Sequence, residues 1–289
     1  MSVLKKIKTI IPAQLVNMGG HIIDQPLPND TIEYIDPFLL IHHWRGELLG
    51  GQRQNEVGVG PHPHRGFSPV TFVYKGNVVH RDSLGNKATV DEGGTQWMFA
   101  GRGITHSERH VKQYVEEGGP LEFIQFWVNA PAELKMTAPF YKPISLEETP
   151  VISNDTSNIY VVAGDFEGVE GVAPINSPQT LLRGDIKAKG ERKINLSTTH
   201  NTLIYLLDGE MSVNGKVARE KDMVVFEAGG ETIQLVAKFD TRFIVLSGAP
   251  LNEPVQSYGP YVMNNQTQIL EAMRDYQMGK MGVLIEDFD

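Results

Sequence analysis

Short runs of β-branched and aromatic residues constrain the fold of this chain more than any other feature. Gly, Pro and Asx residues separate the runs, and Asn214-Gly215 is typical of a two-residue hairpin turn. Regularly spaced short strands predict an all-β chain folded as a sandwich or barrel. The five clearest runs are Pro69–Tyr74, Leu121–Val128, Ile159–Ala163, Thr202–Leu207 and Arg242–Leu246.

A weak internal repeat indicates two copies of one barrel. The segment Phe72–Gly76 precedes Trp97–Gly101, and in the second half Tyr205–Gly209 precedes Val225–Gly229. A strand with a Gly turn, followed by a strand with an Ala-Gly turn, therefore occurs twice in the same order, although short β-segments also resemble one another by chance. A chain of 289 residues has the length of two domains. The proline-rich stretch 139–150 is the expected boundary, which predicts domains at residues 1–140 and 141–289.

One helical pattern is expected near the C-terminus. Asn265 is suited to cap it, with Gln268 three residues later, and Gly279 supplies the stop. Its apolar stripe consists of Ile269, Ala272, Met273 and Tyr276.

Charge and composition exclude several classes of function. The net charge is −9 and no run of five basic residues occurs, so direct binding to nucleic acid is not expected. The chain has no cysteine, which rules out disulfides, thiolate metal sites and cysteine nucleophiles. No apolar run approaches the length of a membrane span. We expect a soluble, cytoplasmic protein without membrane contact.

Two pairs of potential metal ligands stand in the first half. Pro61–Phe67 reads PHPHRGF, and Gly101–Glu108 reads GRGITHSE. Side chains at i and i+2 of a strand point to one face, roughly 7 Å apart at the backbone. Two such strands facing each other across a barrel would bring His62, His64, His106 and Glu108 to one ion.

Each pair is also compatible with polar residues on the solvent face of a strand. Two pairs in one domain, beside apolar runs and tight Gly turns, favour the metal site. Nitrogen and oxygen ligands without thiolate suit Fe, Mn, Ni, Cu or Zn rather than Ca or Mg. Four protein ligands on a six-coordinate ion leave two positions open, whereas a tetrahedral zinc would be closed and structural.

Several segments resemble the pirin family of the cupin superfamily, and the similarity runs nearly from end to end. They are Asp36–Leu40, His62–Phe67, His80–Ser83, Gln96–Met98, Ala100–Glu108, Gln125–Asn129 and Tyr258–Asn264.

This resemblance implies two cupin (jelly-roll) barrels packed face to face, a short C-terminal helix, and one metal in the N-terminal barrel. It assigns the ligand roles to His62, His64, His106 and Glu108, and it implies iron(II), although Zn, Ni, Mn and Cu remain compatible with the ligands. Superposing the two copies at their Gly turns places Gln234 at the position of His106, which predicts a second barrel without ligands. Asn195 and Ser197 then match His62 and His64.

Two segments depart from the family pattern. Ser68 stands where the family commonly has Glu after Arg-Gly-Phe, which changes the charge expected near the site. His42 and His43 stand where the family more often has an acidic residue, and we expect them at the rim or in packing rather than as ligands.

The resemblance leaves two classes of function open. The first is a metal-dependent dioxygenase similar to quercetin 2,3-dioxygenase, which opens the central ring of an oxygen-rich aromatic flavonol and releases carbon monoxide. Glu108 is its candidate catalytic residue, as a ligand or as the base that removes the substrate hydroxyl proton. The second is a non-enzymatic, redox-sensing partner of transcriptional or metabolic proteins. His80 is expected at the barrel mouth or on the surface, and Phe126, Trp97 and Met98 in a flavonoid pocket or in the core.

Overall fold

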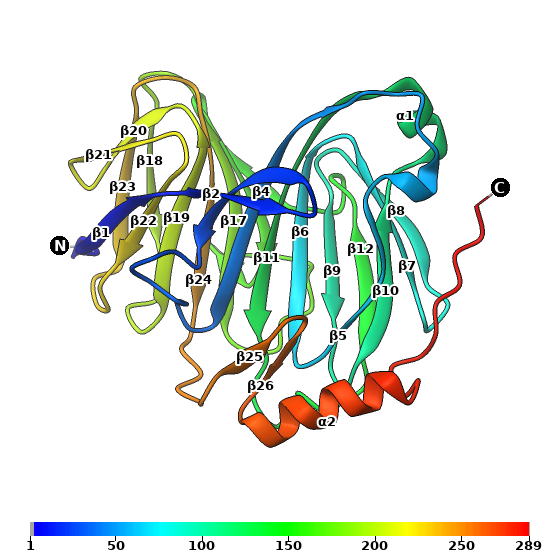
Figure 1. The fold of residues 1–289 in the computed structure, drawn as a ribbon. Helices are drawn as coiled ribbons and strands as arrows, with labels where there is room; N and C mark the ends of the chain where they lie inside the picture. Colours follow the sequence, from blue (N-terminus) through cyan, green and yellow to red (C-terminus); the bar gives the residue numbers. More distant parts are fainter. Residues whose placement is uncertain (1–2, 289) are drawn as a thin grey trace. The chain divides into compact units, whose positions relative to one another are not determined.

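The computed structural model describes residues 3–288, most of them in strands (Figure 1). Asn214 and Gly215 join β20 (Glu210–Val213) to β21 (Lys216–Arg219), and both have the positive φ that a tight hairpin turn requires. The prediction of an all-β fold is confirmed. The five predicted runs lie in β6 (Phe67–Lys75), β11 (Gly119–Asn129), β14 (Ser157–Ala163), β19 (Asn201–Asp208) and β24 (Thr241–Gly248).

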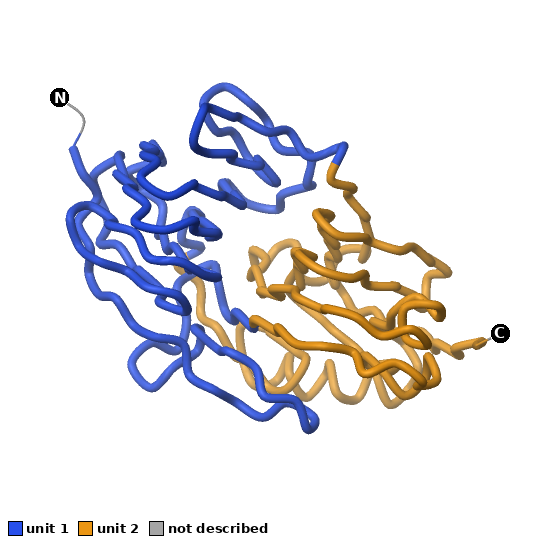
Figure 2. The backbone as a smooth tube through the Cα atoms, turned by 90° about the horizontal axis from the view of Figure 1, so that it is seen from above, with its two compact units in different colours: residues 1–42, 147–251 blue, residues 43–146, 252–289 orange. Residues whose placement is uncertain are grey.

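The chain forms two compact units (Figure 2). Unit 1 combines residues up to His42 with Glu147–Leu251, and unit 2 combines His43–Leu146 with the residues from Asn252 onward. These units group segments by packing rather than by continuity of the chain. The sequence-based domains at 1–140 and 141–289 therefore remain a prediction.

Unit 2 is built from two sheets whose side chains meet in its interior. The first has the order β5 (Val59–His64), β10 (Ile104–Arg109), β7 (Asn77–Asp82) and β8 (Lys87–Asp91). The second contains, in order, β12 (Phe140–Ile144), β9 (Thr95–Phe99), β6 and β11. β4 (Phe38–Leu48) enters unit 2 at His43.

Unit 1 repeats this plan with an apolar interior. Its first sheet has the order β18 (Glu191–Asn195), β23 (Thr232–Ala237), β20 and β21. Its second has the order β1 (Ile7–Pro12), β22 (Asp222–Phe226), β19, β24, β17 (Gln179–Ile186), β14 and β13 (Val151–Ser153). Buried apolar residues from both sheets form one core cluster. A hairpin of β2 (Gln14–Met18) and β3 (His21–Leu27) and a short pair, β15 (Asp165–Phe166) and β16 (Val169–Glu170), complete the unit.

The repeat seen in the sequence is a repeat of strand register. Val70 on β6 pairs with Trp97 on β9, and Leu203 on β19 pairs with Val225 on β22. These are the strands of the Gly-turn and Ala-Gly-turn segments in each half. β12 and β1 occupy corresponding edges beside β9 and β22, but β1 comes from the beginning of the chain.

The C-terminal helix is α2 (Gln266–Gln277), and its predicted cap is confirmed because Gln268 N donates to Asn265 Oδ1 at 3.0 Å. Ile269 and Ala272 are buried and Met273 packs against them, but Tyr276 is exposed, so the apolar stripe is one residue shorter than predicted. Unit 2 also contains α1 (Lys112–Glu117), a 3-10 turn at Gln54–Glu56, and the pair β25 (Gln256–Tyr258) and β26 (Tyr261–Met263). Within residues 3–288 no helix has the length and apolarity needed to cross a bilayer.

Candidate metal centre

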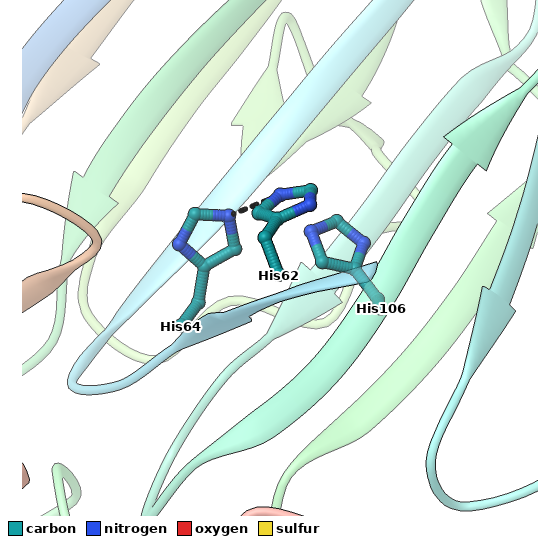
Figure 3. Close-up of side chains that lie close together, drawn as sticks. All are labelled: His62, His64 and His106. Carbon is teal, nitrogen blue, oxygen red and sulfur yellow. Dashed lines mark hydrogen bonds between the residues drawn. The ribbon is translucent and has the colours of Figure 1, made fainter. Parts of the chain in front are cut away.

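Three of the four predicted ligands meet inside unit 2. His62 and His64 lie on β5, and His106 lies directly opposite His62 on the neighbouring strand β10. One ring nitrogen from each histidine lies within 4.8 Å of the others, and the three rings converge (Figure 3). The two ligand-bearing strands were expected to face each other across a barrel. Instead they are hydrogen-bonded neighbours in one sheet, so the register of a single strand pair brings the imidazoles together.

The hydrogen bonds of His62 and His64 determine which ring nitrogen faces the centre. His62 Nδ1 lies 2.8 Å from Gly60 O, and His64 Nδ1 lies 3.3 Å from Pro260 O. A carbonyl oxygen only accepts, so both Nδ1 atoms carry the proton and donate it. In the neutral rings the Nε2 atoms then carry lone pairs, and they lie 3.1 Å apart. Two lone pairs this close repel unless a cation or a shared proton lies between them.

His106 completes the group from a fully buried position. Its Nε2 is buried and has no hydrogen-bond partner among the described residues, while its Nδ1 lies 3.4 Å from His80 Nδ1. Burial, followed by the neighbouring His62, lowers the pKa of both His64 and His106 well below the usual histidine value. Burial therefore favours the neutral imidazole, which is the form that binds a metal.

Glu108, the fourth predicted ligand, lies two residues after His106 but outside the group of converging nitrogens. Gln96 Nε2 donates to Glu108 Oε1 at 2.5 Å, and Gln125 Nε2 donates to both carboxylate oxygens at 3.1 and 3.2 Å. The two glutamines lie on β9 and β11 of the opposite sheet. Two amide donors thus orient the carboxylate inside the unit.

For several residues around this centre, the sequence allowed two locations, and their burial distinguishes between them. His80 is fully buried rather than on the surface, as are Phe126, Trp97 and Met98. Phe126 packs edge-on against Phe72, and Met98 belongs to a small apolar cluster with Ala100 and Ile104, so these two residues are packing residues. His42, His43 and Ser68 are also buried.

Sequence reasoning missed four polar residues that surround the site: Asp82, Gln96, Gln125 and Tyr141. Burial alone would raise the pKa of Asp82, but hydrogen bonds from His80 and Asn86 outweigh it and lower that pKa. Burial raises the pKa of the Tyr141 hydroxyl, so it stays protonated. A polar residue inside a fully buried strand, as Gln96 is in β9, is the signal that could have found them.

The donor set fits a divalent transition ion. A buried, unpartnered Nε2 on His106 and two facing Nε2 lone pairs are costly in a protein interior unless something binds them. Neutral imidazoles suit the later first-row metals and zinc. The geometry therefore supports a histidine triad able to bind a metal, with a carboxylate held nearby.

The corresponding place in unit 1 holds aliphatic side chains. His80 is the fourth residue after Gly76, as Val213 is after Gly209, and each pairs with the strand that matches β10. Val213 pairs with Leu235, as His80 pairs with Glu108, so Ile233 matches His106 and its partner Ile194 matches His62. The superposition at Gln234, Asn195 and Ser197 is therefore wrong by one residue. Ile194, Leu196, Ile233 and Leu235 replace the histidines and Glu108, and all four are buried in the core cluster.

Comparison with known proteins agrees with this architecture. The profile of the Pirin family matches residues 20–128, and that of the Pirin C-terminal cupin domain matches residues 181–282. Pirin-1 of Arabidopsis thaliana is 32% identical over 97% of this chain and 93% of its own length. The chain belongs to the pirin family. The expected two-cupin fold is thereby confirmed, and the histidine triad lies in the segment that matches the first profile.

Two further similarities concern proteins named for an activity. A Pseudomonas aeruginosa protein named "Putative quercetin 2,3-dioxygenase" is 34% identical over 87% of this pirin and 88% of its own length. The crystal structure of quercetin 2,3-dioxygenase from Acinetobacter baumannii matches with a TM-score of 0.92 and 34% identity. It covers 98% of this chain and all of that one.

Proposed function

We propose that this pirin is a metal-dependent dioxygenase of the quercetin 2,3-dioxygenase type, acting on flavonol-like substrates with dioxygen. The observation that carries the proposal is the convergence of His62, His64 and His106 within 4.8 Å, beside a carboxylate held by two amides. The named activity of its P. aeruginosa and A. baumannii relatives agrees with it.

The three Nε2 atoms would hold one divalent transition ion, with Glu108 as the proposed fourth ligand. Such an ion would supply Lewis acidity toward a substrate hydroxyl and, if it is iron, redox chemistry toward dioxygen. We propose iron(II) as the metal, while the ligand types also suit Zn, Ni, Mn and Cu. The carbonyl oxygens of Gly60 and Pro260 would keep two of the rings aligned by accepting their Nδ1 protons.

Glu108 is the residue that we propose for proton transfer. A flavonol loses its 3-hydroxyl proton before the ring is attacked, and a carboxylate beside the substrate is the base that the site offers. The amide groups of Gln96 and Gln125 would hold this carboxylate ready, since each occupies an oxygen lone pair without donating a full charge.

Aromatic side chains beside His64 suit a flat, apolar substrate. Phe67 and Trp127 lie with ring centroids 4.3 Å apart, and each packs edge-on against His64, at 5.1 and 5.6 Å. A planar aromatic ring that reached the histidines would meet Trp127, which is only half-buried, whereas Phe67 is fully buried.

Metal analysis and a quercetin assay test the proposal. The purified protein, reconstituted separately with each candidate metal, is incubated with quercetin and oxygen. We expect about one metal per chain, loss of flavonol absorbance and release of carbon monoxide. A metal-loaded protein that leaves quercetin and related flavonols intact would contradict the dioxygenase and favour the redox-sensing partner.

The variant Glu108→Gln tests the catalytic role. It removes the base while keeping the shape, so turnover should fall about 100-fold or more. Metal content should fall much less than turnover, because the three converging histidines remain as ligands. Glu227→Gln, which changes an exposed carboxylate paired with Lys6 in unit 1, serves as the matched control and should turn over normally. Normal turnover by a metal-loaded Glu108→Gln protein would remove the role.

A further inference from the structure

A buried pair of polar residues lies directly behind His106. His80 and Asp82 are on β7, the neighbour of β10, where Asp82 pairs with His106 and His80 pairs with Glu108. Both side chains are fully buried, and His80 Nε2 lies 2.9 Å from Asp82 Oδ2. Neither residue belongs to the converging histidines. A buried carboxylate and imidazole in an interior otherwise rich in apolar residues require an explanation beyond packing.

The direction of the hydrogen bonds runs from His106 to the carboxylate. Two backbone amides and the Asn86 side chain also donate to Asp82, so its carboxylate is held as an acceptor and His80 Nε2 carries a proton. The other nitrogen of a neutral His80 ring, Nδ1, is then an acceptor. It lies 3.4 Å from His106 Nδ1, so His106 donates its proton there and Nε2 keeps the lone pair.

His106 differs in this respect from the other two histidines. The Nδ1 partners of His62 and His64 are backbone carbonyls, which accept whatever the side chains do. The partner of His106 is another imidazole, which donates or accepts according to where its own proton lies. Asp82, two residues after His80 on the same strand, holds the proton of His80 on Nε2.

We propose that Asp82, His80 and His106 form a relay that fixes the tautomer of His106, so that His80 and Asp82 are positioning residues for the metal. Tyr141 holds the relay in place, since its ring stacks on His80 at 3.6 Å with an interplanar angle of 1°. The hydroxyl of Tyr141 donates to Gln96 Oε1 at 3.4 Å, and Gln96 in turn donates to Glu108. One buried network therefore orients both His106 and the carboxylate.

Unit 1 gives independent support for this role. Val213 stands in the place of His80, and Ile233 stands in the place of His106, both inside the core cluster. The barrel plan does not itself require a polar residue at the position of His80. The polar residue occurs in the unit that has a histidine for it to orient.

The first test reads the tautomer directly and rests on no activity. The inference rests on the metal site of the proposed function. Nitrogen-15 shifts of the histidine rings in the metal-free protein nevertheless report the tautomer of His106 without any metal. We expect the His106 Nδ1 atom to be protonated and Nε2 to be bare in the natural protein. His80→Phe keeps the stacked ring and removes the acceptor, so Nε2-protonated His106 should appear. A His106 ring already protonated at Nε2 in the natural protein would overturn the relay.

The second test measures metal affinity by chelator competition with nickel(II). Loss of such an outer partner typically weakens metal binding about 10-fold to 100-fold, and we expect this for His80→Phe. His80→Asn, whose amide oxygen can replace the Nδ1 acceptor, should restore most of the affinity. His42→Phe is the matched control, because His42 is a buried histidine with a side-chain partner in unit 1.

These measurements separate the relay from the dioxygenase. If quercetin is not consumed but His80→Phe weakens nickel binding as expected, the proposed reaction is contradicted and the relay is supported. Equal nickel affinity in folded His80→Phe and the natural protein would overturn the relay even if turnover is observed. If His80→Phe does not fold, the ring shifts of the natural protein decide, because they require no variant.

Discussion

The four-stranded sheets of the two units have the same strand order and corresponding registers, but different interiors. In unit 1 the inward positions of β18 and β23 carry Ile194, Ile233 and Leu235, which join a continuous apolar core. In unit 2 the matching positions of β5 and β10 carry His62, His106 and Glu108. One backbone plan therefore accommodates either an aliphatic core or a polar centre, and the side chains alone decide which.

The opposite sheets differ in the same way. Gln96 and Gln125, which donate to Glu108, correspond through the shared register to Val224 and Val245, both in the apolar core of unit 1. A carboxylate in unit 1 would meet these two valines in place of the amide donors. The site in unit 2 is therefore a set of matched substitutions on both sheets, since a buried charge without donors is strongly destabilising.

The largest effect, on metal affinity, should follow from replacing His106 of unit 2 by isoleucine, the residue at the matching position of unit 1. His106→Ile removes one of the proposed ligands, and metal affinity should fall by about 100-fold to 1000-fold if each ligand supplies a comparable part of the binding free energy. Elemental analysis and chelator competition measure the loss. The metal-free variant should still fold, because isoleucine is the residue that unit 1 uses at this position.

The control for this variant is His42→Ile in unit 1, which also replaces a buried histidine but should leave metal binding unchanged. Full metal retention by His106→Ile would mean that His106 is not a ligand and that the exchange of histidine for isoleucine does not distinguish the two units.

The reverse exchange should have a smaller effect. Ile233→His places a polar ring among aliphatic groups without a partner, and we expect the free energy of unfolding to fall by about 2–3 kcal/mol. Chemical denaturation measures it. Gln234→His, at the next residue and only half-buried, should change stability by less than about 0.5 kcal/mol. A larger loss at Gln234 than at Ile233 would show that the register between the units is wrong.

The smallest expected effect is in the acid response of the metal-free protein. Burial lowers the pKa of His106, so the unfolded chain binds that proton first, below pH about 6.5. Protonation therefore favours the unfolded chain, and the free energy of unfolding decreases as pH falls below that value. The His106→Ile variant should lose about 1 kcal/mol less than the natural protein between pH 7 and 5.5. Parallel stability curves for the two proteins would contradict this.

The sequence predicted the parts of the fold that depend on neighbouring residues. β-Branched runs became strands, Asn214-Gly215 became a hairpin turn, and Asn265 capped the helix, because propensity, turn geometry and capping act over a few residues. The spacing of His62 and His64 also predicted that their rings converge, since alternation along β5 places both on one face.

Long-range pairing was the part that could not be predicted. Nothing in the sequence says that β5 and β10 are neighbours, or that Val213 faces Leu235, and a shift of one residue moved the superposition from Ile233 to Gln234. The role of His80 was missed for the same reason. Its partner Asp82 lies on the same strand, β7, but His106, the residue that we propose it orients, lies on the neighbouring strand β10.

Strand β1 has a consequence for biosynthesis. Residues Ile7–Pro12 leave the ribosome long before Asp222–Phe226, the strand with which they pair. β1 must therefore wait until β22 has been made before it finds these hydrogen-bonding partners. A fragment that starts at residue 141 would leave the backbone of β22 bare on that side, and an unpaired strand of this kind readily joins another molecule. Expression of the second half alone should for this reason include Ile7–Pro12 as a linked segment.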